Sequence, residues 1–157
     1  MLPGTGRILV AVLCGRFTER VEAVASSLAS KNVLVAAFKL DEVRHIGLEA
    51  VLTAVVSSYA AIVSGRSIAR KSWIEPHLYL YRTRNIRDVI PKLPKPGDTV
   101  LVAVAAPSDG GEAILRDVAR AVEAPSEKCI VDRASSPALV SSIAQFPVEA
   151  RVYRTRA

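Results

Sequence analysis

Hydrophobic residues fall along the chain in two kinds of block, which predict strands and helices in alternation. Short runs of aliphatic and β-branched residues bounded by turn residues predict buried strands, at residues 8–14, 33–38 and 99–105. Apolar residues that recur every three or four positions predict helices, at residues 18–29, 41–63, 112–122 and 137–146. Residues 129–131 are a weaker strand candidate. Taken alone, this alternation favours a parallel doubly wound sheet.

The predicted helix 41–63 is apolar on most of its sides. Only Glu49 is charged between Ile46 and Val63, so a membrane span is an alternative, but marginal length and internal Thr and Ser residues oppose it. Such a helix is more often buried in its own domain or covered by a partner protein. We expect one part to face the core, through Leu48, Leu52, Val55, Tyr59 and Ile62. The rest leaves an apolar surface for a partner, through Val51, Ala54, Ala61 and Val63.

The segment 66–90 combines positive charge with aromatic rings. Its cationic side chains are Arg66, Arg70, Lys71, Arg82, Arg84 and Arg87. Apolar and polar residues alternate between Trp73 and Tyr81, and this period of two predicts a half-buried strand whose rings face outward. Asn85 is a suitable N-cap for the short helix expected after it.

Arginines beside exposed rings are typical of proteins that bind single-stranded nucleic acid, because guanidinium groups contact phosphates and rings stack on bases. The opposite interpretation is that the rings pack on a neighbouring helix and the arginines lie in solvent. The net charge of +6 is concentrated in two regions, with +5 in residues 66–92 and +3 in residues 151–157. These regions suit an anionic partner, which could be a nucleic acid, a membrane surface or an acidic protein.

The length of 157 residues fits one domain with a substantial core. Its cysteines, Cys14 and Cys129, lie far apart and have no metal-site spacing. Buried free thiols are expected there, with a disulfide as the alternative. The apolar run before Cys14 is short and ends in the bulky Leu13. It therefore makes a poor export signal, and we expect a cytoplasmic protein.

Motifs for catalysis are largely missing from the sequence. His45 and His77 have no partners at metal-ligand spacing, and neither a Gly-x-Ser-x-Gly elbow nor a Walker lysine is present. We therefore expect no enzyme activity, no cofactor and no metal. The alternative is a small nucleotide-binding enzyme that uses the Gly110–Gly111 turn before the predicted helix 112–122. Asp109 and Glu112 would repel a phosphate at that turn.

The central segment resembles a known family. The residues that carry the resemblance are the run GRSIARKSWIE at 65–75 with the apolar stretch after it, the run NIRDVI at 85–90, the turn at Gly97 and the apolar strand at 100–104. Together they resemble the small kinase-binding subunit of the KEOPS complex, in its archaeal form. The chain departs from that family's pattern at Pro76–His77, at residues 81–84 and at Asp88–Val89.

The resemblance implies a non-catalytic subunit of the complex that makes threonylcarbamoyladenosine on tRNA. Members of this family bind the complex's kinase-like ATPase through an apolar surface and hold the single-stranded 3′ end of tRNA. The resemblance also replaces the parallel sheet with an α+β fold, in which helices flank a largely antiparallel or mixed sheet. It implies one domain over residues 1–157, with a basic C-terminal tail at 151–157.

On this basis we predict two binding surfaces. Phosphates of tRNA would be contacted by the six cationic side chains of segment 66–90 (Arg66, Arg70, Lys71, Arg82, Arg84 and Arg87), with Tyr79 and Tyr81 as stacking residues. The kinase-like ATPase would contact the predicted helix 137–146, through Leu139, Val140, Ile143 and Phe146. No membrane and no small-molecule substrate is expected. A further alternative is a structural adaptor that does not contact RNA.

Overall fold

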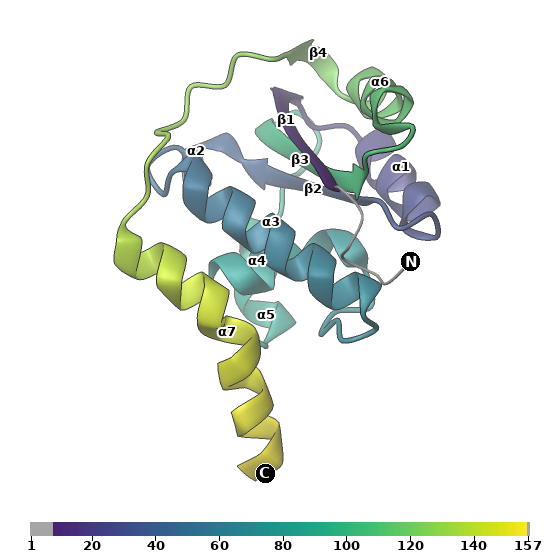
Figure 1. The fold of residues 1–157 in the computed structure, drawn as a ribbon. Coiled ribbons are helices and arrows are strands. Elements are labelled where there is room, and N and C mark those ends of the chain that lie inside the picture. The colour runs from purple at the N-terminus through teal and green to yellow at the C-terminus, as the bar shows by residue number, and fades with distance from the viewer. Residues whose placement is uncertain (1–7, 157) are drawn as a thin grey trace.

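A four-stranded antiparallel sheet in the order β2-β3-β1-β4 lies at the centre of the fold (Figure 1). The structure, a computed structural model, describes residues 8–156, with side chains as far as Phe146. Strands β1 (Ile8–Arg16) and β3 (Thr99–Pro107) pair along their whole length. Strand β2 (Leu34–Lys39) lies on the other side of β3, and β4 (Glu123–Ser126) pairs only with the last residues of β1.

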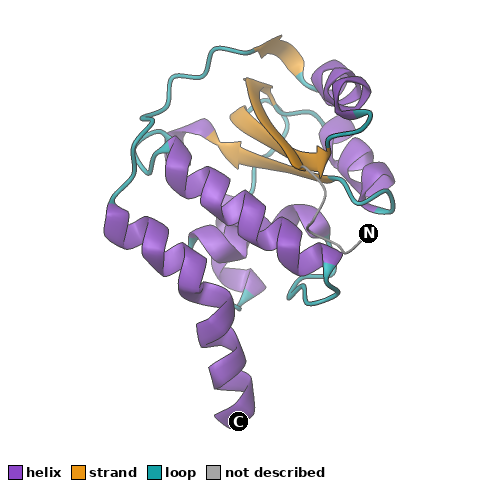
Figure 2. Ribbon diagram, viewed as in Figure 1, coloured by secondary structure: helices purple, strands orange, loops and turns teal. Residues whose placement is uncertain are grey.

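Seven helices pack on this sheet within the described residues. They are α1 (Glu19–Ala29), α2 (Leu40–Val43), α3 (Leu48–Val63), α4 (Glu75–Leu80), α5 (Ile86–Val89), α6 (Gly111–Ala121) and α7 (Pro137–Arg156), with 3-10 turns η1 (Ser72–Ile74) and η2 (Ile90–Lys92). Helices α1 and α6 cover one face of the sheet, and α3, α4 and α7 lie on the other (Figure 2). The chain is therefore a single α+β domain, and the expected antiparallel α+β fold is confirmed.

Strand β3 shows why the middle of this antiparallel sheet has no polar face. Leu101, Ala103 and Ala105 pack towards α3, whereas Val100, Val102 and Val104 pack towards α1 and α6. Successive side chains of a strand point to opposite faces, so a strand covered on both sides must be apolar throughout. The predicted strands at 8–14, 33–38 and 99–105 correspond to β1, β2 and β3, and the parallel arrangement is wrong.

The predicted helix 41–63 is interrupted. Helix α2 ends at Val43 and α3 begins at Leu48, because the chain turns at Gly47 with a φ of +100°. A side chain at Gly47 would collide with the carbonyl oxygen of Ala134 and the hydroxyl of Ser135. A distant part of the chain therefore ends α2 and starts α3, which local periodicity could not reveal.

The buried face of α3 also differs from the prediction. Val51, Ala54 and Ala61 are buried, whereas Leu52 and Ile62 are only half-buried. The helix packs against the sheet, α4 and α7 at once, so the apolar surface expected for a partner is mostly covered by the chain itself. Among the described residues, no helix combines the length and apolar character that crossing a membrane requires.

Two further local predictions are wrong. Residues 73–80 lie in η1 and α4 instead of a strand, and Tyr81 follows as the C-cap of α4. Pro76 fits the first turn of a helix, and residues 74–80 are all buried, so their alternation does not mark a half-exposed strand. Residues 129–131 belong to the linking segment, residues 127–136, which runs without strand pairing from β4 to α7. The fourth strand, β4, precedes it.

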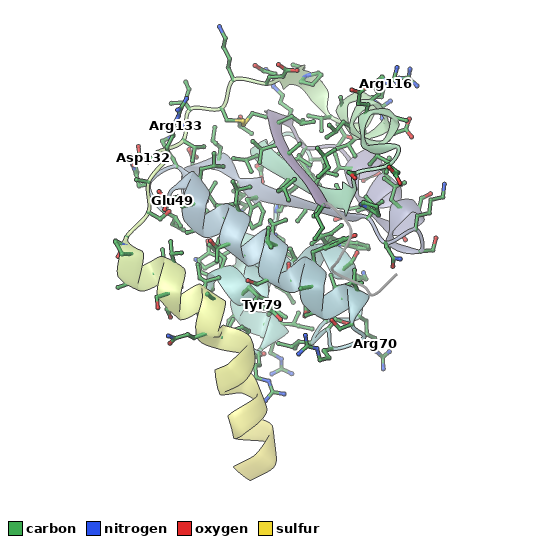
Figure 3. The ribbon with its side chains drawn as sticks, in the orientation of Figure 1. Glu49, Arg70, Tyr79, Arg116, Asp132 and Arg133 are labelled. Atoms are coloured by element: carbon green, nitrogen blue, oxygen red, sulfur yellow. A yellow bond between two sulfur atoms is a disulfide. The ribbon has the colours of Figure 1, made fainter. Side chains whose placement is uncertain are left out.

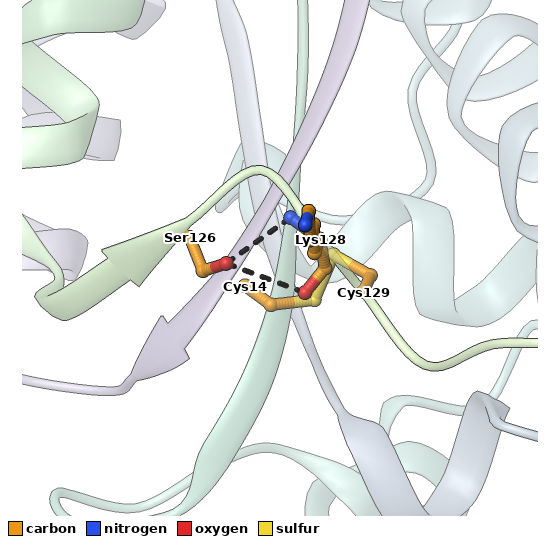
Figure 4. Close-up of a disulfide and its surroundings, with 4 residues drawn as sticks. All are labelled: Cys14, Ser126, Lys128 and Cys129. Atoms are coloured by element: carbon orange, nitrogen blue, oxygen red, sulfur yellow. Dashed lines mark hydrogen bonds between the residues drawn. A yellow bond between two sulfur atoms is a disulfide. The ribbon is translucent and has the colours of Figure 1, made fainter.

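Cys14 and Cys129 form a disulfide, so the expectation of free thiols is wrong (Figure 4). Their Cα atoms are 5.6 Å apart, although the residues are 115 positions apart in the sequence. Cys14 lies in β1 and Cys129 in the linking segment. The bond therefore fastens the C-terminal part of the chain to the central sheet.

Candidate nucleic-acid interface

The six predicted phosphate contacts lie on two segments and are all exposed. Arg66, Arg70 and Lys71 belong to the loop between α3 and η1, and Arg82, Arg84 and Arg87 belong to the α4–α5 turn and to α5. We call these six side chains the basic end. In Figure 3, Arg70 lies at the end of the molecule opposite β4 and α6.

A small hydrophobic cluster places the two segments of the basic end next to each other. Ala69 from the loop, Leu78 from α4 and Val89 from α5 are buried together, with Ile68 and Ile86 packed against them. Arg70 and Lys71 directly follow Ala69, and Arg87 lies two residues before Val89. Cations that are far apart in the sequence are therefore carried by neighbouring backbone.

Glu75 fixes the loop that carries three of these cations. Its side chain is fully buried, and its carboxylate accepts hydrogen bonds from the backbone N–H groups of Ile68, at 2.7 and 3.0 Å, and Ala69, at 2.6 Å. A buried carboxylate needs such donors, and bonds to a charged acceptor are stronger than neutral ones. Sequence reasoning missed this role, because the partners of Glu75 are backbone N–H groups of a loop, which no pattern of side chains specifies.

The α4–α5 turn is also held by side chains. Arg82 adopts a left-handed φ of +49° and donates to the carbonyl of Leu80 at 2.6 Å. Asn85 accepts from the N–H of Arg87 at 3.1 Å, which confirms it as the N-cap of α5. Thr83 donates to Asp88 at 2.6 Å and closes the turn. Arginines on a turn of this kind are presented with little freedom of the backbone.

Most of the basic end is available for ionic contacts with a partner. Four salt bridges join described residues, and none of them contains Arg66, Arg70, Lys71, Arg82 or Arg87. The ammonium of Lys71 lies 5.5 Å from the centre of the Trp73 ring. The side chains of the predicted basic tail at 151–157 lie outside the described ones, although α7 itself continues to Arg156.

The predicted stacking residues are not presented as exposed rings. Tyr79 is only 2% exposed and packs edge-on against Phe146, with ring centres 5.2 Å apart, so its assignment as a stacking residue is wrong. Burial raises its pKa to about 12. Tyr81 is half-buried beneath Lys92, whose ammonium lies 4.5 Å from the ring centre, and its hydroxyl donates to Glu42. Burial, followed by the charge of Glu42, raises the pKa of Tyr81.

The predicted partner surface on α7 lies inside the fold. Ile143 is fully buried and Phe146 is 5% exposed, and Leu139 and Val140 pack half-buried against the same cluster. These residues contact the core formed with α3 and α4, because the apolar stripe of α7 docks the helix onto its own domain. This surface cannot be the contact for another protein while α7 is docked.

His77 contacts the backbone of β2, the edge strand of the sheet. It is 2% exposed, and its Nε2 lies 3.0 Å from the carbonyl oxygen of Ala37 in β2, with the Phe38 ring beside it. Burial lowers its pKa from 6.5 to about 4, so the ring is neutral at pH 7 and donates to that carbonyl. The cavity at His77 measures about 20 Å³, which is room for roughly one water molecule.

Glu75 and His77, two residues apart on α4, contact different parts of the fold. Residues two apart on a helix point in nearly opposite directions. Glu75 therefore binds the loop 66–71, and His77 binds β2. Within the described side chains, no group of His, Cys, Asp and Glu has the arrangement of a metal site.

The Gly110–Gly111 turn has structural reasons for both glycines. Gly110 adopts a left-handed φ of +77° at the start of α6, a conformation that glycine reaches without strain. A side chain at Gly111 would collide with that of Leu9 in β1. These glycines therefore do not by themselves indicate a phosphate site.

No family model matches this chain, and no curated protein matches it in sequence. A functional assignment therefore depends on the chain's own residues and their arrangement. Its best-defined surface feature is the basic end, with the loop held by Glu75 and the turn held by Asn85 and Thr83.

Proposed function

We propose that this protein is a non-catalytic RNA-binding subunit and that its basic end contacts the phosphates of tRNA. The observation that supports this most is the exposure of six cations on two segments that share one small core. Each phosphate that a cation neutralises releases counterions, so a group of cations supplies affinity without any sequence-specific pocket. Backbone fixed by Glu75 and Asn85 lowers the entropy that binding would otherwise cost.

The sequence resemblance makes this proposal more specific. The chain resembles the small kinase-binding subunits of the KEOPS complex, and on that basis the RNA would be the 3′ end of tRNA and the partner a kinase-like ATPase. Because Ile143 and Phe146 are buried, the ATPase would have to meet another surface than the one predicted. The segment 73–81 is helical here, whereas the family pattern has a strand. RNA binding therefore has more support than membership of the complex.

The two alternatives make different predictions. A nucleotide-binding enzyme built on the Gly110–Gly111 turn would be strongly stabilised by a nucleotide alone in a thermal-shift assay. A structural adaptor would show no specific RNA binding at all. The geometry favours neither, because Gly110 is explained by its left-handed φ, Gly111 by its contact with Leu9, and the cations lie on neighbouring segments.

The test compares charge reversals at the two ends of the molecule. The double variant Arg70→Glu/Arg87→Glu changes the basic end, and the matched control Arg116→Glu/Arg120→Glu makes the same charge change on α6. Figure 3 shows Arg116 far from Arg70. Binding of tRNA and of a short single-stranded RNA ending in CCA is measured by fluorescence anisotropy at several salt concentrations.

We expect the basic-end variant to lose roughly tenfold or more in affinity, with a slope of log K against log salt flatter by about 0.7 for each lost contact to a single strand. The α6 variant should retain most of the wild-type affinity and slope. Equal losses in both variants would show that only net charge matters. Unchanged binding in the basic-end variant would refute the assignment.

A further inference from the structure

The linking segment, residues 127–136, caps a helix that lies far from it in sequence. The N–H groups of Leu48 and Glu49, in the first turn of α3, donate to the carbonyls of Asp132 and Arg133 at 2.7 and 3.1 Å. The next N–H, of Ala50, donates to the hydroxyl of Ser135 at 2.9 Å. The first N–H groups of a helix have no partner within it, so the linking segment supplies what a local N-cap normally would. Figure 3 shows Glu49, Asp132 and Arg133 close together.

The linking segment itself is held mainly by its backbone. Glu127, Lys128, Asp132 and Arg133 are exposed, and Ile130 is 78% exposed. After it, α7 contributes Ile143 and Phe146 to the core. Leu139 and Val140 of α7 and Val131 of the linking segment pack half-buried against the same core. Among the residues whose side chains the structure describes, this part of the chain buries far fewer side chains than the sheet does, and such a part opens more easily than the core.

The disulfide joins the linking segment to the sheet. Cys14 is 6% exposed in β1, and Cys129 is a half-buried residue of the linking segment (Figure 4). While the bond exists, the linking segment cannot leave the sheet, and α7 begins only eight residues after Cys129. Cys129 is the more exposed residue of the two.

We propose that the Cys14–Cys129 disulfide is a redox-controlled clasp, whose reduction releases the linking segment and α7 from the domain. A thiolate of a dithiol reductant attacks Sγ of Cys129, and Cys14 leaves as a thiolate and takes up a proton. The second thiol of the reductant then displaces Cys129. Two electrons and two protons pass to the protein, and the dithiol becomes a disulfide.

Release changes what the domain exposes. It uncovers the three N–H groups at the start of α3 and the apolar sides of α3 and α4 that Ile143 and Phe146 cover. Reduction thus exposes an apolar surface on α3 and α4, next to the N-terminus of α3. This inference does not depend on RNA binding by the basic end.

Hydrogen–deuterium exchange of the full chain tests the clasp. It is measured for the oxidised protein, for the protein reduced with dithiothreitol and for Cys129→Ser, with Ser126→Ala as a matched control that changes a neighbouring side chain and keeps the disulfide. We expect the amides of Leu48, Glu49 and Ala50 and those of α7 to exchange on the order of a hundredfold faster after reduction. Amides of β3 should be unchanged, and Ser126→Ala should behave as the oxidised wild type.

Two results would overturn the proposal. Equal exchange in α3 and α7 before and after reduction would show that the remaining contacts hold the segment without the disulfide. An equal rise in β3 would show that the bond stabilises the whole domain instead of clasping one part. Dithiothreitol must also leave Cys129→Ser unaffected, since an effect there would have a cause other than the disulfide.

Discussion

The central sheet and the C-terminal part of the chain are held in different ways. In β3, every residue from Val100 to Ala106 is at most 1% exposed, with helices on both sides. The linking segment is mostly exposed and depends on a disulfide and on hydrogen bonds to α3. The described contacts of the sheet are many, whereas those of the linking segment and of residues 137–146 are few, so single substitutions should loosen these residues more easily.

The largest effects should come from cavities in the two regions. Leu101→Ala in β3 and Ile143→Ala in α7 both truncate a fully buried side chain, and each should cost about 2 to 5 kcal/mol. The comparison predicts that Leu101→Ala lowers the free energy of global unfolding, measured by urea denaturation. Ile143→Ala should mainly speed amide exchange in α7, especially in the reduced protein. If both variants speed exchange in β3 equally, the two regions are one cooperative unit.

Lowering the pH should reduce the free energy of unfolding, because His77 is buried in its neutral form. The unfolded state binds a proton below pH 6.5, but burial keeps the folded state from doing so until about pH 4. The unfolded state therefore binds more protons between these values, and stability falls as the pH falls, by roughly 3 kcal/mol in total. His77→Gln can still donate to Ala37 but does not titrate, so its urea stability should fall less over this range. Equal acid sensitivity of the two proteins would contradict the assignment.

Glu75→Gln tests whether Glu75 affects RNA binding through its charge or through its hydrogen bonds to the loop of the basic end. The substitution removes a negative charge, so electrostatics alone predicts tighter RNA binding. If the carboxylate instead positions the loop through Ile68 and Ala69, binding weakens and the protein loses about 1 to 3 kcal/mol in stability. Glu112→Gln, on the exposed surface of α6, is the control for charge. Tighter binding by Glu75→Gln in the anisotropy assay would count against positioning.

The smallest predicted effect concerns the cap of α3. Ser135→Ala removes the acceptor for the N–H of Ala50 and should cost about 1 kcal/mol, the usual contribution of an N-cap. Exchange of the Ala50 amide should rise more than that of Leu48, because the carbonyl of Asp132 still accepts from Leu48. Ser67→Ala, at an exposed serine, should change neither. No change at Ala50 would mean that the hydroxyl contributes nothing to the cap.

The sequence indicated the residues of the candidate site but not their geometry. Charge and sequence proximity selected six cations; the structure shows that all six are exposed, and their contact with RNA stays a prediction. The rings were misassigned because alternation between Trp73 and Tyr81 imitates a strand, while Pro76 starts a helix that is buried on every side. Period-two alternation reports a half-exposed environment only when one face meets solvent.

The sequence by itself determined the three long strands, the main helices, the N-cap at Asn85 and the concentration of positive charge. These follow from local periodicity and side-chain chemistry, which act over a few residues. The tertiary structure alone decided the break at Gly47, the disulfide, the role of Glu75 and the inward face of α7. Each of these depends on backbone that arrives from another part of the chain, so its cause is a contact in space that no local pattern encodes.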